Sequence, residues 1–267
     1  MNYLYGKFKT EIFKALHRKW QLTALLFTLV GFPLFMKAFA VIMAKASEQA
    51  NEPPELFIAE VAGVHVKMTM FVLFIPLWTA TFVGQEFSSN HVNKAVFLTS
   101  KKDYFISKII YCFIVSLWFA AIESMSVAFS LDGGLFQSPL TKLSFIYWFA
   151  PHVFLINLFY ALIFLCVTFA YRSPTASLLA AYCFPQLDGF AYHLFAKLFH
   201  INLNWLPFKL LNSTYIQNGY KYDANQYYNP LYEGELLIFL GPAALAVGLC
   251  FLSYRWFLVR DLKTMSD

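Results

Sequence analysis

Charged residues are scarce in this sequence. They make up 13% of its 267 residues, whereas hydrophobic residues make up 59%. A soluble domain carries about 25% charged residues, so the shortage excludes an ordinary soluble protein and predicts an integral membrane protein. The net charge of +5 then reports on membrane topology, and we expect no nucleic-acid partner.

The motifs of enzymatic chemistry are missing as well. The sequence has no G-x-x-x-x-G-K-[ST] segment, so we expect it to hold no ATP of its own. It has no H-E-x-x-H pair and no nucleophile elbow, which leaves an intramembrane hydrolase without support. Its four cysteines lie in apolar runs without a C-x-x-C pair, which indicates buried free thiols. We therefore expect no catalytic residue, metal or cofactor in this chain.

Long hydrophobic runs are what the sequence does have. Six of them are long enough, at about 20 residues each, to cross a bilayer. They cover residues 21–43, 67–83, 104–130, 145–171, 174–195 and 236–258. Ser173 and Pro174 are typical of the N-cap and first turn of the fifth run. The sequence thus predicts a single all-α transmembrane domain over residues 1–267.

The distribution of basic residues predicts the orientation. Thirteen of the 20 Lys and Arg fall in the N-terminal segment, the loop at residues 84–108, the turn at Arg172 and the C-terminal tail. Because an excess of Lys and Arg marks the cytoplasmic side, we expect both termini in the cytoplasm. Residues 44–66 and 197–233 then lie outside, the latter rich in tyrosine.

Residues 1–20 show an apolar repeat of four residues. Lys7, Lys14 and Arg18 gather on the face opposite that repeat. The repeating positions are Leu4, Phe8, Ile12, Leu16 and Trp20. This pattern predicts an amphipathic helix in the membrane interface, with its basic face toward anionic headgroups of membrane lipids. An ordinary solvated helix is the alternative.

The loop after the second run is polar and charged. Within it Val92, Ala95 and Val96 have i, i+3, i+4 spacing, which predicts a short helix with one apolar stripe. Ser100 and Asp103 form a capping box for the next helix. Three consecutive residues are expected to cap the start of the short helix: Ser88, Ser89 and Asn90. Periodicity alone leaves two interpretations open, a docking helix or a plain connector.

Several acidic, basic and serine positions follow one another in a definite order along this loop. Glu86 leaves the second run, Lys94 is the next basic position, Ser100-Lys101 follows, and Lys108 opens the third run. In this order the loop resembles the first cytoplasmic loop of ABC-2 type (type V) exporter permeases. The sequence departs from the family pattern in Asn90-His91, where the family has Gly-Thr, and in Thr99, where proline is frequent.

The resemblance implies a six-span permease in a bacterial plasma or inner membrane, with residues 1–20 as its elbow helix. It implies a dimer, of identical chains or with a paralogue, bound to two ATPase subunits that hold ATP and Mg²⁺. Glu86, Lys94, Val96 and Lys101 are the expected docking residues of the coupling loop at residues 84–103. An aromatic interior suits an amphipathic or lipid-like cargo, such as a peptide or antibiotic, moved out of the cytoplasm or inner leaflet. The alternative is a membrane scaffold or sensor that recruits a cytoplasmic partner through the same loop.

Three polar residues lie inside the predicted spans: Glu123, Asn157 and Asp188. An ionised carboxylate at such depth costs at least a few kcal/mol unless it is paired. Two interpretations follow, a polar patch at an outer gate or hydrogen bonds that hold helices together. Of these we favour the helix tie.

The topology is open to a direct test. Cysteines introduced at Glu52 and Tyr222 should react with an impermeant maleimide in intact cells, while one at Lys101 should react only after permeabilisation. Labelling at Lys101 from outside would overturn the orientation.

Overall fold

A computed structural model describes residues 2–50, 74–89, 91–130, 139–200 and 236–259. Within those ranges the chain is helical and contains no strand. The helices are α1 (Asn2–His17), α2 (Lys19–Ala50), α4 (Ile75–Ser88), α5 (His91–Leu98), α6 (Lys101–Ser130), α7 (Pro139–Tyr171), α8 (Pro174–Leu198) and α10 (Leu236–Val259). The predicted all-helical class is confirmed for this part of the chain.

Three of the described helices are long and apolar enough to cross a membrane. These segments are Lys19–Ala46, Lys101–Phe129 and Val153–Tyr171, and they coincide with the first, third and fourth predicted runs. The membrane character is therefore supported, and the full six-span layout stays a prediction. The start of the second run and most of the predicted outer segments, at residues 51–73, 131–138 and 201–235, lie outside the described residues.

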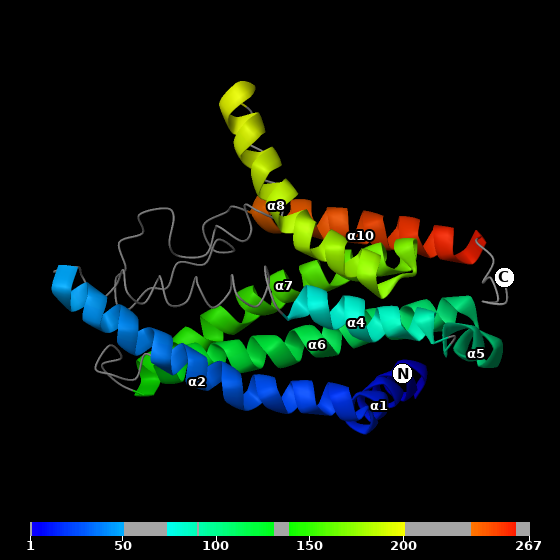
Figure 1. The fold of residues 1–267 in the computed structure, drawn as a ribbon, viewed down its shortest axis with the longest axis horizontal. Helices are drawn as coiled ribbons and strands as arrows, with labels where there is room; N and C mark the ends of the chain where they lie inside the picture. The colour runs from blue at the N-terminus through cyan, green and yellow to red at the C-terminus, as the bar shows by residue number, and fades with distance from the viewer. Residues whose placement is uncertain (1, 51–73, 90, 131–138, 201–235, 260–267) are drawn as a thin grey trace.

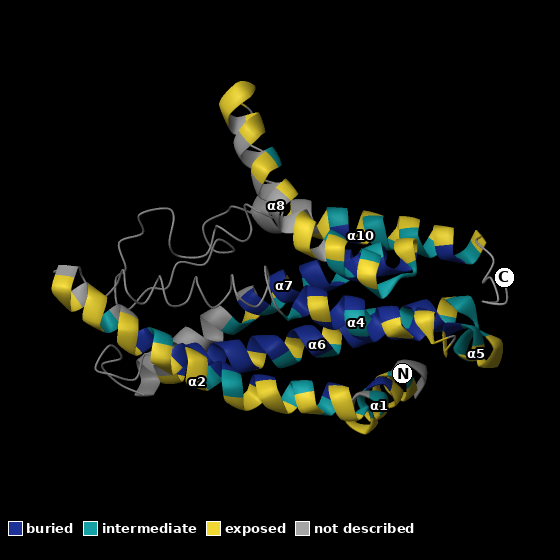
Figure 2. Ribbon diagram, viewed as in Figure 1, coloured by how far each residue is buried: buried dark blue, intermediate teal, exposed yellow. Residues whose placement is uncertain are grey.

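Helix α6 lies at the centre of the bundle. It packs against α2 and α7, while α4 packs against α7 and α8, and α10 packs against α7 (Figure 1). Buried positions concentrate on α4, α6 and α7, and the outer faces of α2, α8 and α10 remain exposed (Figure 2). Many of those exposed side chains are apolar, among them Phe27, Leu187 and Phe251. Such faces suit contact with lipid.

A glycine permits the close approach of α4 and α8. A Cβ atom built on Gly84 would lie 2.9 Å from the Cα of Pro174. Because Pro174 is the first residue of α8, a larger side chain at position 84 has to push the start of that helix away. Ser173 caps α8 as predicted, since its hydroxyl accepts from the amide of Ala176 at 3.4 Å.

Helices α1 and α5 and the last turn of α10 lie at the same end of the bundle (Figure 1). This arrangement agrees with the prediction that the terminal helices share a side with the loop. The side of the membrane on which they lie stays a prediction.

Some predicted boundaries differ from the structure. Helix α4 continues to Ser88, five residues past the predicted end at 83. Phe87 keeps it helical by packing its ring against Phe169, with the ring centroids 5.2 Å apart. Helix α2 continues to Ala50, past the predicted end of the first run at residue 43. Helix α7 begins at Pro139, before the predicted start of the fourth run at residue 145.

The predicted caps of the short helix are partly wrong. The hydroxyls of Ser88 and Ser89 donate to the carbonyl of Gln85, at 3.1 and 2.6 Å, so they close the end of α4. Asn90 lies outside the described residues. The capping box before α6 is confirmed, because the Ser100 hydroxyl donates to the Asp103 carboxylate and accepts from its amide.

Candidate functional site

An ionic cluster joins three parts of the chain at the end of the bundle that carries α5. Its members are Glu11 on α1, Arg18 between α1 and α2, Glu86 on α4, and Tyr104 and Lys108 on α6. We name these five residues the Glu86 cluster.

Lys108 is the centre of the cluster. Its ammonium lies 3.2 Å from Glu11 Oε2 and 2.9 Å from Glu86 Oε2. The Arg18 guanidinium donates to Glu86 Oε1 at 2.6 Å, and the Tyr104 hydroxyl donates to Glu86 Oε2 at 2.7 Å. Glu86 therefore accepts from three donors, two on α6 and one between α1 and α2.

Burial makes these contacts strong constraints. The side chain of Lys108 is 2% exposed, and those of Glu11 and Glu86 are 2% and 6% exposed. A buried charge is stable only when it is paired and hydrogen-bonded. Burial by itself raises the pKa of Glu86, but the charges and hydrogen bonds of Lys108, Arg18 and Tyr104 outweigh it and lower the pKa from 4.5 to about 2.

A second polar layer continues the cluster toward the bundle interior. The hydroxyl of Tyr111 accepts from Trp78 Nε1 at 2.6 Å and from Gln21 Nε2 at 2.7 Å. The Lys108 ammonium lies 5.3 and 5.6 Å from the ring centroids of Tyr104 and Tyr111, within cation–π range. Helices α2, α4 and α6 are thus fastened together at this depth too.

Helix α5 presents one face to the bundle and one outward. Val92 is buried, and Ala95 and Val96 pack partly buried against the core, so the predicted inward stripe is confirmed. Phe97 and Leu98 are 90% and 79% exposed. Together with the exposed Lys94 they form a surface that we name the α5 tip (Lys94, Phe97 and Leu98).

The structure separates the four predicted docking residues. Glu86 is buried in its cluster, Val96 is half-buried, and Lys101 donates to the carbonyl of Leu258 on α10 at 2.9 Å. Lys94 alone among the four is on the outer surface. Glu86 and Lys101 therefore position α5 and α6 within this chain, and their direct contact with a partner stays a prediction.

Sequence reasoning missed several members of these sites. Glu11 is the one acidic residue among the first 20, in an otherwise basic segment, and this isolation was a usable signal. Phe97 and Leu98 follow Lys94 at i+3 and i+4, which places them on one helical face. No local signal in the sequence indicated which residues of different helices pair with one another, such as Arg18 with Glu86.

The intramembrane polar residues are partly brought together. The Asn157 amide donates to Glu123 Oε2 at 3.2 Å, and both side chains are fully buried between α6 and α7. This contact is the one that a helix tie requires. Asp188 lies on α8, but its side chain is outside the described residues, so a gate formed with Glu123 stays a prediction.

The cysteines are free, as predicted, but their environments differ from one another. Cys112 and Cys166 are buried, whereas Cys183 is exposed on α8, contrary to the expected burial. Cys166 on α7 and Cys250 on α10 place their sulfurs 3.6 Å apart. Within the described ranges, no group of three or more His, Cys, Asp or Glu residues could hold a metal ion.

Comparison with protein-family models, with curated proteins and with solved structures finds no match for this chain. The physical arrangement of the site therefore carries the functional argument.

Replacing Lys108 by Met should destabilise the protein strongly, because Glu11 and Glu86 would then face each other buried without their shared cation. Breaking a buried pair costs about 3–5 kcal/mol, and thermal unfolding in detergent should show a large drop in Tm. Lys94→Met, which removes an exposed cation, is the control and should change the stability by less than about 0.5 kcal/mol. Equal melting of both variants would contradict a structural role for the cluster.

The cluster also predicts a pH dependence. Because the folded pKa of Glu86 is about 2 and the ordinary value is 4.5, its contribution is complete above pH 4.5 and is lost as pH falls toward 2. The loss is at most about 1.4 kcal/mol per pH unit for one proton. Glu86→Gln should flatten this part of the Tm-against-pH profile between pH 5 and 3. A variant profile parallel to wild type would show that Glu86 is not the titrating group.

Proposed function

We propose that this chain is the transmembrane subunit of an ATP-driven exporter of the ABC-2 type. The observation that carries the proposal is the placement of α5. A short helix lies at one end of a membrane-type bundle, its inner stripe is packed on the core, and its tip exposes Phe97 and Leu98 beside Lys94. An aromatic side chain with a neighbouring cation, displayed on a supported helix, is suited to docking in a pocket of a soluble partner.

The Glu86 cluster supports a coupling role for this helix. Helix α4, which carries Glu86, precedes α5 in the chain, and helix α6, which carries Lys108, follows it. The ion pairs between them, and those to Glu11 and Arg18, join α1, α4 and α6 close to α5. A push on the α5 tip would therefore move these helices as one body. In the proposed mechanism two such chains bind two ATPase subunits, whose ATP-driven closure supplies that push.

A groove between α2 and α4 is consistent with the proposed amphipathic cargo. It has a volume of about 410 Å³. Its lining combines aromatic rings with threonine hydroxyls: Trp20, Thr23, Ala24, Phe27, Thr28, Phe74, Leu77, Trp78, Thr81 and Phe82. Mainly apolar walls with a few hydroxyls accept a molecule that is largely apolar and carries some polar groups.

The test is the recovery of an ATPase subunit with this chain. We expect affinity purification of the tagged chain from its native membranes to recover a Walker-motif ATPase. The double variant Lys94→Glu, Phe97→Ser should lose at least about ten-fold of that subunit, because truncation of a central aromatic anchor costs about 2 kcal/mol or more and the charge reversal adds to it. Insertion and thermal stability should stay normal, since both side chains are exposed.

Lys45→Glu is the matched control, because Lys45 is exposed on α2 near the end of that helix distant from α5 (Figure 1). It should leave the recovery unchanged. If the chain co-purifies with a regulator that has no ATPase motif, and loses it in the double variant, the scaffold alternative replaces the exporter. Undiminished ATPase recovery in the double variant would remove the α5 tip from the interface.

A further inference from the structure

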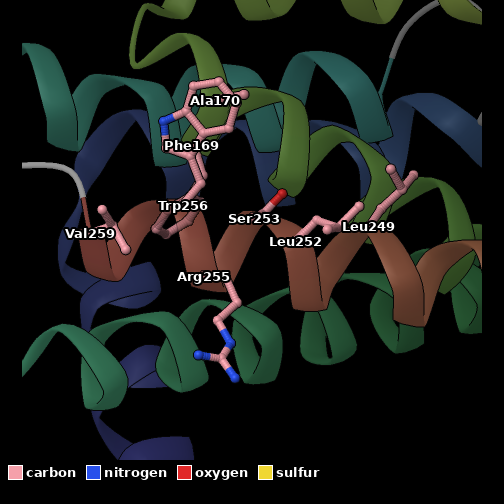
Figure 3. Close-up of a pocket in the computed structure, with 8 residues that line it drawn as sticks. All are labelled: Phe169, Ala170, Leu249, Leu252, Ser253, Arg255, Trp256 and Val259. Carbon is pink, nitrogen blue, oxygen red and sulfur yellow. The ribbon is translucent and has the colours of Figure 1, made fainter.

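A groove of about 980 Å³ runs between α7 and α10. Its lining residues are Phe169, Ala170, Leu249, Leu252, Ser253, Arg255, Trp256 and Val259 (Figure 3). Six of these eight side chains are apolar, and the two others are a serine and one cation. The groove lies near the end of the bundle that carries α5, because α7 ends at Tyr171 and α10 at Val259.

We propose that this groove holds one anionic phospholipid, with an acyl chain along α10 and its phosphate at Arg255. The proposal requires α10 to lie in a bilayer. It does not depend on the exporter function, since neither the α5 tip nor an ATPase takes part in the site.

The apolar part of the groove suits an acyl chain. Leu252, Trp256 and Val259 are all more than half exposed, so they offer a continuous apolar strip on the outside of α10. Phe169 forms the buried floor, held edge-on against Phe257 with the centroids 4.9 Å apart. A tryptophan exposed in the last turns of a membrane helix is typical of headgroup depth. The acyl chain of the lipid would therefore run along α10 from Trp256 toward Leu249.

Arg255 supplies the charge. Figure 3 shows its side chain leaving α10 on the side away from Ala170, so the guanidinium flanks the groove instead of filling it. The guanidinium stacks on Phe251, 5.3 Å from the ring centroid. Stacking covers one face of this group and leaves its in-plane N–H donors for a phosphate. Among the described residues, no carboxylate forms an ion pair with Arg255.

The surroundings of the groove are positive. Lys101 reaches the last turn of α10, where it donates to the carbonyl of Leu258. Two acidic groups at this end of the bundle are engaged elsewhere, since Asp103 bonds to Ser100 and Glu86 is paired with Lys108. Basic pockets between membrane helices on the cytoplasmic side bind anionic headgroups. Charge complementarity therefore selects an anionic lipid over a zwitterionic one.

A second copy of this chain fits the groove less well. In a two-fold interface the same patch faces itself. Arg255 of both chains would then be buried in one interface, and a buried charge there costs free energy unless it is paired. A lipid phosphate meets no such opposition.

The test uses the full chain, purified in a non-ionic detergent and examined by native mass spectrometry. Phosphatidylglycerol and phosphatidylcholine with identical acyl chains are added separately. We expect one phosphatidylglycerol per chain to be retained in preference to phosphatidylcholine. Arg255→Gln should weaken phosphatidylglycerol binding about five-fold and remove the preference, since one cation near an anionic headgroup contributes about that factor. Ala170→Trp should strongly reduce retention of both lipids, because the indole would occupy the part of the groove beside Phe169.

Two controls match these variants. Lys102→Gln removes an exposed cation at the same end, and Val247→Trp adds an indole to an exposed position of α10 outside the groove. Both should retain phosphatidylglycerol as wild type does. Each variant should also melt near the wild-type temperature, because all the substituted residues are exposed.

Three results would overturn the proposal. Equal retention of the two lipids by wild type would remove the anionic selectivity. Unchanged phosphatidylglycerol retention in Ala170→Trp would place the lipid elsewhere. Conversion of a dimer into a monomer by Ala170→Trp, with no change in lipid count, would assign the groove to a second copy of the chain.

Discussion

A single buried ammonium group determines how one end of this molecule is assembled. Lys108 is almost fully enclosed, and an unpaired cation there would cost several kcal/mol. It sits on α6, and the carboxylates that neutralise it come from α1 and α4. Helix α1 therefore lies against α6, and the C-terminal end of α4 lies beside the N-terminal end of α6. Because the connection between Ser88 and Lys101 is short, fixing these two helix ends also restricts where α5 can lie.

The two ends of the described bundle are consequently held by different forces. At the α5 end, ion pairs and directional hydrogen bonds fix α1, α2, α4 and α6 in register. Farther along, the helices are held by close packing of apolar side chains, with Asn157 and Glu123 as a polar tie. Packing in lipid gains little from the hydrophobic effect, because the lipid tails are themselves apolar. The parts of α2 and α8 distant from α5 are thus held less firmly than the α5 end.

Local signals predicted the helices well and long-range pairing poorly. The N-terminal caps of α6 and α8 were predictable because a cap depends on residues three positions apart. The inward stripe of α5 was predictable from its period. Glu86, however, was predicted as a docking residue of the loop. No local pattern in the sequence indicated its burial, which depends on Lys108 and on Arg18, the latter 68 residues away in the sequence. The Cys166–Cys250 contact was missed for the same reason: sulfur atoms 84 residues apart meet only after α7 and α10 pack.

An aromatic layer connects the groove to the Glu86 cluster. Phe169 lines the groove, and its ring lies 6.0 Å from that of Tyr104, whose hydroxyl bonds to Glu86. The same ring packs at 5.2 Å against Phe87, the residue after Glu86. An occupant of the groove and a partner on α5 would therefore contact neighbouring parts of one packed layer. Close-packed interiors deform little and transmit displacement. If occupation of the groove shifts Phe169, the shift reaches Tyr104 and Phe87 first, and any resulting change in partner affinity must be matched by an equal change in lipid affinity.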